Sequence, residues 1–206
     1  MAATRRMVMF NRVSAEGYFT AGDGKLDWTV PDPALDQQAA SRLAEPGTML
    51  FGRKTYDMFE SFWPKITGDA PTAPNPHAPG VSREMKVMAD WINASEKLVF
   101  SRTKKNVRWN NSQLFHELDP KAVAALKQKP GPDIMIFGSG SIVSQLTAHG
   151  LIDEYQFVVA PVLLGTGRPP IADVSKRTML ELLEAKAYPA GNVMLRYAPK
   201  ANRPLP

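Results

Sequence analysis

One stretch of the chain, residues 132–146, limits the possible folds more than any other. Its apolar run Ile134 to Phe137 is typical of a strand that is buried on both faces of a sheet. Gly138 and Gly140 follow this run and allow the backbone to turn tightly. The next apolar residues have the spacing of one buried helix face: Ile142, Val143 and Leu146. The stretch therefore predicts a buried strand, a glycine turn and the start of a helix.

The helix that follows the turn has two candidate capping residues, Ser139 and Ser141. A helix N-terminus carries free N–H groups and a partial positive charge, which suits a phosphate. Val143, however, stands where the six-residue dinucleotide fingerprint has its last glycine. The residues of this stretch alone leave two interpretations open, a phosphate site and a plain tight turn.

The strand–turn pattern occurs twice more in the chain. Residues 48–51 run directly into Gly52-Arg53-Lys54-Thr55, and residues 97–100 run into Ser101-Arg102. Cations at a helix start oppose the helix dipole, so an anion held between them and the backbone explains them best. Surface solvation of the two arginines is the alternative. Because ligands collect at the C-terminal ends of strands in open α/β sheets, the three junctions predict one site.

Strands alternate with helices through most of the chain, and the C-terminal part is rich in strands. We expect strands over 7–13, 48–51, 97–100, 112–115, 134–137 and 155–160, and helices over 35–43, 53–59, 82–92 and 119–127. Residues 178–188 and 192–197 are predicted to be two antiparallel strands. The order predicts an α/β protein with a mainly parallel central sheet, an antiparallel C-terminal edge and flanking helices. With 206 residues, we expect a single domain whose core covers about 7–197.

A segment with five prolines, residues 64–80, interrupts this pattern. Pro64, Pro71, Pro74, Pro76 and Pro79 exclude regular structure across it, so it is expected to be a loop. A lid over the site, a dimer contact and a surface insertion are all open interpretations.

Composition excludes several classes of function. The chain has no cysteine, which excludes disulfides and thiolate catalysis, and its three histidines lie far apart, so no metal site is predicted. The formal net charge is +5, but the basic residues are scattered, so we expect no nucleic-acid partner. No apolar run is long enough to span a bilayer, and we expect a cytoplasmic protein with no membrane partner.

Taken together, the motifs resemble the dihydrofolate reductase-like family. The closest resemblance is to the reductase domain of bacterial riboflavin biosynthesis, the C-terminal half of a bifunctional deaminase–reductase, here as a stand-alone protein. The resemblance covers about residues 7–197 and implies the three-layer fold of that family. Its landmarks are residues 13–18, 23–28, 52–55, 100–102, 137–141 and 161–167.

The resemblance implies NADPH as the cofactor. Gly52, Arg53, Lys54 and Thr55 would hold its phosphates, Ser101 and Arg102 would meet its 2′-phosphate side, and Ala15 would lie near the nicotinamide. The pyrophosphate would be cradled by Gly138, Ser139, Gly140, Ser141 and Ile142. A guanidinium at Arg53 or Arg102 favours NADP over NAD on physical grounds as well, because its fork matches a phosphate.

The substrate side departs from the family pattern. The first loop of the family commonly reads Ser-x-Asp-Gly, whereas this chain has Glu16 in place of the aspartate. Glu16 and Asp27 are the candidate catalytic acids, which would orient the substrate or relay a proton to it. Trp28 is a candidate for stacking on a heterocycle, and Arg168 for binding a substrate phosphate. A surface carboxylate at Glu16 and a core aromatic at Trp28 are the alternatives.

The sequence thus predicts an NADPH-dependent oxidoreductase that acts on a small pteridine- or aminopyrimidine-type heterocycle. Reduction of 5-amino-6-(5-phosphoribosylamino)uracil is one candidate reaction. A dihydrofolate reductase and a non-catalytic nucleotide-binding protein that keeps the fold are the alternatives. The chain cannot contain the zinc motif of the deaminase half, because it has no cysteine. We also expect a homodimer, in which the C-terminal strands pair or pack across a two-fold axis.

Overall fold

The computed structural model describes residues 4–43, 45–66, 81–175 and 177–200. The strands are β1 Met7–Val13, β2 Thr20–Ala21, β3 Thr48–Gly52, β4 Glu96–Phe100, β5 Ser112–Phe115, β6 Ile134–Phe137, β7 Glu154–Val159, β8 Gly167–Arg168, β9 Leu180–Ala187 and β10 Val193–Pro199. The helices are α1 Pro33–Ser41, α2 Arg53–Phe62, the 3-10 helix η1 Trp63–Lys65, α3 Arg83–Ala94, α4 Pro120–Lys127 and α5 Gly140–Ala148.

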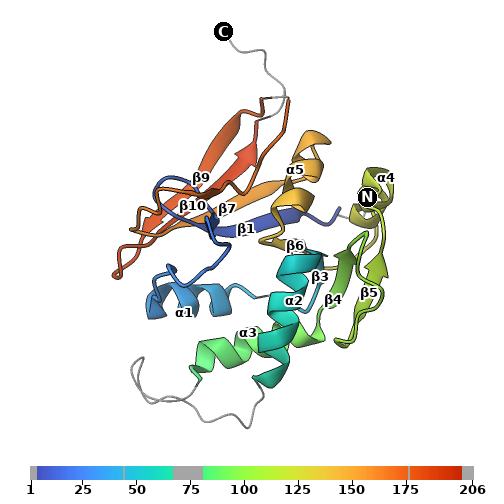
Figure 1. Ribbon diagram of the computed structural model, residues 1–206, viewed down its shortest axis with the longest axis horizontal. Helices are drawn as coiled ribbons and strands as arrows, with labels where there is room; N and C mark the ends of the chain where they lie inside the picture. The colour runs from blue at the N-terminus through green and yellow to red at the C-terminus, as the bar shows by residue number, and fades with distance from the viewer. Residues whose placement is uncertain (1–3, 44, 67–80, 176, 201–206) are drawn as a thin grey trace.

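Eight of these strands form one sheet, in the order β5-β4-β3-β6-β1-β7-β10-β9 (Figure 1). The six strands from β5 to β7 pair in parallel, whereas β10 pairs antiparallel with both β7 and β9. The predicted α/β class, with a mainly parallel sheet and an antiparallel C-terminal edge, is confirmed. The short strands β2 and β8 pair with each other outside this sheet.

Helices cover both faces of the sheet and make three layers. On one face, Val123 of α4 and Val143 of α5 pack with Leu50 of β3 in the largest buried cluster. On the other face, α2 and α3 pack on Met49, Phe51 and Val99, while Leu35 of α1 packs on Val158 and Met194. Successive residues of β3 therefore serve opposite faces, as the pleat of a strand requires.

Helices α1 and α2 end at other residues than expected. Helix α1 already ends at Ser41, before the predicted stop signal at Pro46, and Arg42 closes its last turn. Helix α2 runs three residues further than expected and continues into η1, which contains Pro64. Pro64 lies at the start of η1, where a missing N–H costs nothing, so its assignment to the irregular loop was wrong. The other prolines of the expected 64–80 loop lie outside the described residues.

An edge and the interior of the sheet differ in exposure. Strand β9 is an edge strand with exposed Leu182 and Leu183, while β6 lies inside the sheet with Ile134 and Ile136 fully buried. Across the described parts of the chain, no helix has both the length and the apolar character needed to cross a bilayer.

Candidate functional site

The three strand–turn junctions predicted to form one site do meet at one edge of the sheet. Gly52 at the end of β3 lies opposite Phe100 at the end of β4, and Phe137 at the end of β6 lies opposite Phe10 of β1. Because all four strands are parallel, the residues that follow them emerge at the same edge. The fold thus brings together the turns that begin at Gly52, Ser101 and Gly138.

Two of these junctions are locked to each other by hydrogen bonds. The Ser139 hydroxyl accepts a hydrogen bond from the Gly52 N–H at 3.0 Å, and the Ser139 N–H donates to Thr55 Oγ1 at 3.0 Å. Ser139 has left-handed backbone angles, φ 52° and ψ 46°, and its side chain makes no capping bond to α5. Ser139 is therefore the N-cap residue by position, but its hydroxyl serves the neighbouring strand instead of its own helix.

The helix N-termini at this edge differ from the others in their capping. Asp32, Ser82 and Asp119 cap α1, α3 and α4 with side-chain hydrogen bonds to backbone N–H groups. Helices α2 and α5, which start at the site, have no side-chain cap bond from the part of the chain that the structure describes. Their first N–H groups are thus left for water or for an anion, and the dipoles of both helices favour the anion.

The cations that were predicted to hold phosphates lie at this edge and are exposed. Among the described residues, Arg53 has one charged partner, Asp57, at a long distance of 3.5 Å, and Lys54 and Arg102 are exposed to solvent. The Ser101 side chain is buried, and its hydroxyl accepts from the Thr103 and Lys104 N–H groups. Ser101 therefore shapes the turn that presents Arg102.

The glycine turn at the start of α5 is closely packed. Gly138 has φ 55°, and a side chain at Gly140 would meet the Phe19 ring at 3.0 Å. Ser141 is exposed, whereas Ile142 packs in the core and its N–H donates to the Ser139 carbonyl at 2.8 Å. The structure thus gives Ile142 a packing role, and its contact with a cofactor stays a prediction.

The first loop lies beside this turn. Ala15 follows β1, is exposed, and its N–H donates to the Val162 carbonyl at 2.9 Å. The Glu16 carboxylate accepts hydrogen bonds from the Leu164 N–H at 2.6 Å and the Gly165 N–H at 2.8 Å. The Leu164 N–H, more than any other group, holds the pKa of Glu16 below its usual value.

The remaining candidate substrate residues lie along the loop that follows β2. Asp27 is exposed, and Trp28 is half-buried with its indole N–H donating to the Lys25 carbonyl at 3.2 Å. Arg168 of β8 is exposed, and its guanidinium lies beside Gly24. The structure thus brings Arg168 to the same loop as Trp28, and no contact joins Asp27 to Glu16 among the hydrogen bonds of the described residues.

A row of aromatic rings that the sequence analysis missed starts at the glycine turn. Phe137, which directly precedes Gly138, lies 5.8 Å from both Phe10 and Phe59, measured between ring centroids. The row continues from Phe59 to Trp63, with 5.9 Å between their ring centroids. The Phe62 ring lies 5.1 Å from the Trp63 ring. None of these five rings is fully buried. The register of β1 and β6 places Phe10 beside Phe137, whereas Phe59 reaches Phe137 from α2.

A charged pair on the same side of the sheet was also missed. Arg12 of β1 points to the face that carries Phe10, and its Nη2 lies 3.5 Å from Asp36 Oδ1 of α1. Burial lowers the pKa of Arg12 and raises the pKa of Asp36. An arginine within an apolar inner strand was the available signal, because such strands rarely carry a charge.

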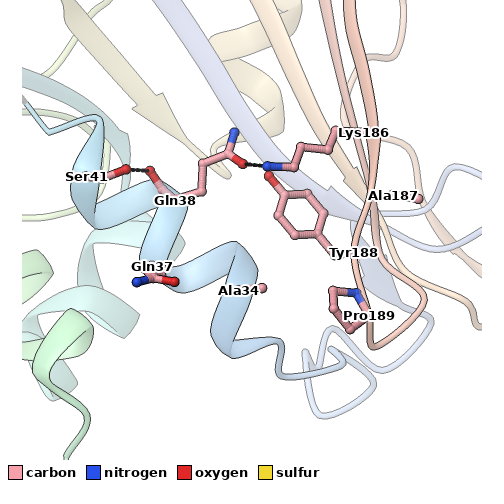
Figure 2. Close-up of a pocket in the computed structure, with 8 residues that line it drawn as sticks. All are labelled: Ala34, Gln37, Gln38, Ser41, Lys186, Ala187, Tyr188 and Pro189. Carbon is pink, nitrogen blue, oxygen red and sulfur yellow. Dashed lines mark hydrogen bonds between the residues drawn. The ribbon is translucent and has the colours of Figure 1, made fainter.

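An open pocket of about 410 Å³ lies elsewhere, between α1 and the end of β9 (Figure 2). Figure 2 shows the Lys186 amine directed at the Gln38 amide oxygen, with the Tyr188 ring beneath. None of the predicted site residues lines this pocket. In the described part of the chain, no three His, Asp or Glu side chains are grouped so that they could hold a metal ion.

Comparisons with known proteins agree with this architecture. A Shewanella protein provisionally assigned to riboflavin biosynthesis superposes with a TM-score of 0.67 at 22% identity, over 98% of this chain and all of that one. The Thermotoga maritima diaminohydroxyphosphoribosylaminopyrimidine deaminase/5-amino-6-(5-phosphoribosylamino)uracil reductase gives a TM-score of 0.61 at 11% identity, over 96% of this chain and 57% of that longer one. At these identities, the structural matches show the fold.

The family follows from the sequence comparisons. The chain is 28% identical to the uncharacterized protein YyaP of Bacillus subtilis over 94% of each chain. The family model of the RibD C-terminal domain matches residues 5–194. Because that match spans nearly the whole chain, the protein belongs to the RibD C-terminal domain family.

Proposed function

We propose that this protein is an NADPH-dependent reductase of a flat nitrogen heterocycle of the aminopyrimidine or pteridine type. The family supports a reductase of the riboflavin-pathway type. The observation that carries the cofactor is the pair of uncapped helix N-termini, α2 and α5, at one edge of the sheet with Arg53 and Arg102 exposed beside them. A dinucleotide with several phosphates fits two such termini better than a single anion does.

The exposed cations and the uncapped helix starts at this edge support this cofactor. The N–H groups at the start of α5 and the glycine turn would take the pyrophosphate, while Arg53 and Arg102 would take the 2′-phosphate. The cofactor supplies the hydride when bound. The chain itself binds the phosphates, orients the reacting rings and, through the loop that contains Ala15, shields the nicotinamide end from water.

The aromatic row supports a flat ring as the substrate. Phe10, Phe59 and Phe137 present half-buried rings beside the proposed cofactor turn, and such faces stack on planar heterocycles. Arg12 and Asp36 would offer a charged edge to the polar groups of that ring. A phosphorylated substrate such as 5-amino-6-(5-phosphoribosylamino)uracil would also need a cation, for which exposed Arg168 is the candidate.

The proposal is tested by fluorescence titration of the purified protein with NADPH and NADH. We expect NADPH to bind at least tenfold more tightly than NADH, because a guanidinium–phosphate pair contributes roughly 1.5–3 kcal/mol. The variants Arg53→Ala and Arg102→Ala should each reduce this preference. Arg83→Ala is the matched control, since Arg83 is also an exposed arginine in a first helical turn, but of the capped helix α3.

The outcomes separate the candidate functions. Preferential NADPH binding followed by oxidation of NADPH with an aminopyrimidine or pteridine supports the reductase, and the preferred ring identifies the substrate class. Binding without turnover of any such ring favours the non-catalytic nucleotide-binding protein. Failure to bind either dinucleotide would overturn the proposal.

A further inference from the structure

We propose that Glu16 is a positioning residue, whose carboxylate clamps the 161–167 loop onto the first loop and thereby sets the space around the glycine turn of the proposed cofactor site. The effect on the cofactor site rests on the proposed function, whereas the clamp itself does not. It gives Glu16 a different role from the proton relay that the sequence suggests.

The geometry of the carboxylate indicates an anchor. Its Oε2 accepts from the Leu164 N–H at 2.6 Å and from the Ser14 hydroxyl at 3.1 Å, while Oε1 accepts from the Gly165 N–H at 2.8 Å. Both oxygens are thus occupied by donors of the protein itself. Hydrogen bonds from N–H groups stabilise the ionised form, which suits a permanent acceptor better than a group that must gain and lose a proton.

The clamp is one of several contacts that join residues 14–21 to residues 162–168. The Ala15 N–H donates to the Val162 carbonyl, and the Phe19 N–H donates to the Arg168 carbonyl, both at 2.9 Å. Strands β2 and β8 extend this contact as a short antiparallel ladder. At Gly167, a side chain would lie only 2.4 Å from the Thr20 carbonyl, so the two backbones are in direct contact. These contacts join two segments, 148 residues apart at Glu16 and Leu164, into one packed body.

This body rests on the glycine turn of the proposed cofactor site. The Phe19 ring of the first segment lies 3.0 Å from where a Gly140 side chain would begin, and the Pro170 carbonyl of the second lies 3.2 Å from the same point. Gly140 is the first residue of α5. A shift of either segment would consequently change the space above the helix N-terminus that is proposed to take the pyrophosphate.

The length of the side chain matters for this role. Glutamate reaches the Leu164 and Gly165 N–H groups with its two separate oxygens. An aspartate at the same backbone position is one methylene shorter and cannot keep both bonds without movement of a loop. Glu16→Asp should therefore resemble Glu16→Ala in loop order, although it retains the negative charge.

The first experiment measures hydrogen exchange of the Leu164 and Gly165 amides by NMR, without any nucleotide. We expect the protection factors to fall about tenfold in Glu16→Ala and Glu16→Asp, the equivalent of one modest hydrogen bond. Glu16→Gln keeps the length and one acceptor oxygen, so the loss should be smaller. Asp23→Asn is the control, because Asp23 is an exposed carboxylate nearby whose bonds to described residues all lie within its own turn.

A pH series adds a second readout. In the wild type, protection of these two amides should persist below pH 4.5 and disappear only when the Glu16 carboxylate gains a proton. Protection in Glu16→Gln should not change with pH in that range. Unchanged protection in Glu16→Ala would overturn the clamp.

The second experiment titrates the same variants with NADPH and measures turnover. If Glu16 acts by positioning, NADPH affinity should fall about tenfold in Glu16→Ala and by less in Glu16→Gln. The variants should have the same order of NADPH affinity as of amide protection. A proton-transfer role predicts instead that Glu16→Gln keeps wild-type protection and affinity but loses turnover by about a hundredfold or more. That second pattern would overturn the proposal, as would lost protection with unchanged affinity.

The two proposals fail in different ways. If the wild type binds no dinucleotide, the proposed function and the positioning role both fall, while the exchange result still decides whether the clamp exists. If NADPH binds and Glu16→Ala leaves the amides protected, the reductase stands and the clamp falls.

Discussion

Lys97 is a charged side chain that the fold uses entirely for structure. It is fully buried in β4, and its Nζ donates to the carbonyls of Asn93, Ser95 and Asn110 at 2.9, 2.7 and 3.2 Å. The amine also lies 4.4 Å from the centroid of the Trp109 ring. Burial lowers its pKa to about 8, so at pH 7 most of the amine is still charged and can donate to all three carbonyls.

The variant Lys97→Met should lower the free energy of unfolding by about 2 kcal/mol, because buried carbonyls lose their donors while the volume stays similar. Urea unfolding at pH 7 measures this. Lys121→Met is the control, since Lys121 is exposed on α4. If the two variants lost the same stability, the hydrogen bonds of Lys97 would have no net structural value.

Glu16 and Ser139 illustrate the same principle in the site itself. Both are polar residues that the sequence suggests for direct work on a ligand or a cap, and both instead hold backbone N–H groups of a distant segment. A polar side chain next to a glycine turn is thus as much a part of the framework of the site as of its chemistry.

The turn between β6 and α5 depends on a backbone conformation that most residues avoid. Ser139 has a positive φ of 52°, which is costly for any residue with a Cβ atom. Its hydroxyl compensates by accepting the Gly52 N–H. The junction is therefore held by side-chain chemistry in a conformation that would otherwise favour glycine.

Ser139→Gly should have a free energy of unfolding about 1 kcal/mol higher than that of Ser139→Ala. Both variants lose the hydroxyl, but only glycine relieves the positive φ. Ser141 lies two residues later, inside α5. There the order should reverse, with Ser141→Ala more stable than Ser141→Gly, as is usual within a helix. Chemical unfolding of the four variants checks both orders, and the same order at both positions would contradict this account.

Charged groups connect α1 to the antiparallel edge of the molecule. Glu184 of β9 accepts from both terminal nitrogens of Arg42 at 3.2 Å and from Arg196 of β10 at 3.0 Å. Arg196 in turn donates to buried Glu154 of β7 at 2.6 Å. The hydrogen bonds from Arg42, and then those from Arg196, lower the pKa of Glu184 to about 2.

This network predicts a specific acid sensitivity. Because the folded pKa of Glu184 lies below the unfolded value near 4.5, its contribution is complete above pH 4.5 and is lost as the pH falls toward 2. Glu184→Gln should therefore be about 1 kcal/mol less stable than the wild type at pH 7, with a difference that shrinks below pH 4.5. Unfolding curves from pH 2 to 7 measure this.

Glu181→Gln is the matched control for the acid series, since Glu181 is exposed on the same strand. It should leave stability nearly unchanged at every pH. A difference between wild type and Glu184→Gln that stays constant from pH 7 to 2 would show that Glu184 contributes through packing and not through its charge.

The homodimer stays a proposal. Its candidate contact is the edge strand β9, on which Leu182 and Leu183 are exposed.

The sequence by itself determined most of the elements and the fold class, but not the short elements β2, β8 and η1. Apolar runs such as Ile134 to Phe137, the glycine turn that follows, and the cap Asp119 with Pro120 are local signals, because each depends on neighbours within a few residues. The alternation of strands with helices then required a mainly parallel sheet. The predicted meeting of three strand–turn junctions also followed, since parallel strands end at one edge.

Only the tertiary structure decided which groups meet. Ser139 forms a hydrogen bond with Gly52, which is 87 positions away in the sequence. Glu16 forms one with Leu164, which is 148 positions away. The Phe10–Phe137 contact likewise depends on the register of β1 against β6, the Phe59–Phe137 contact on where α2 packs, and the Arg12–Asp36 pair on where α1 packs. A local pattern specifies a strand or a helix but not its neighbours, because strand order and register are decided by how all the apolar faces are buried together.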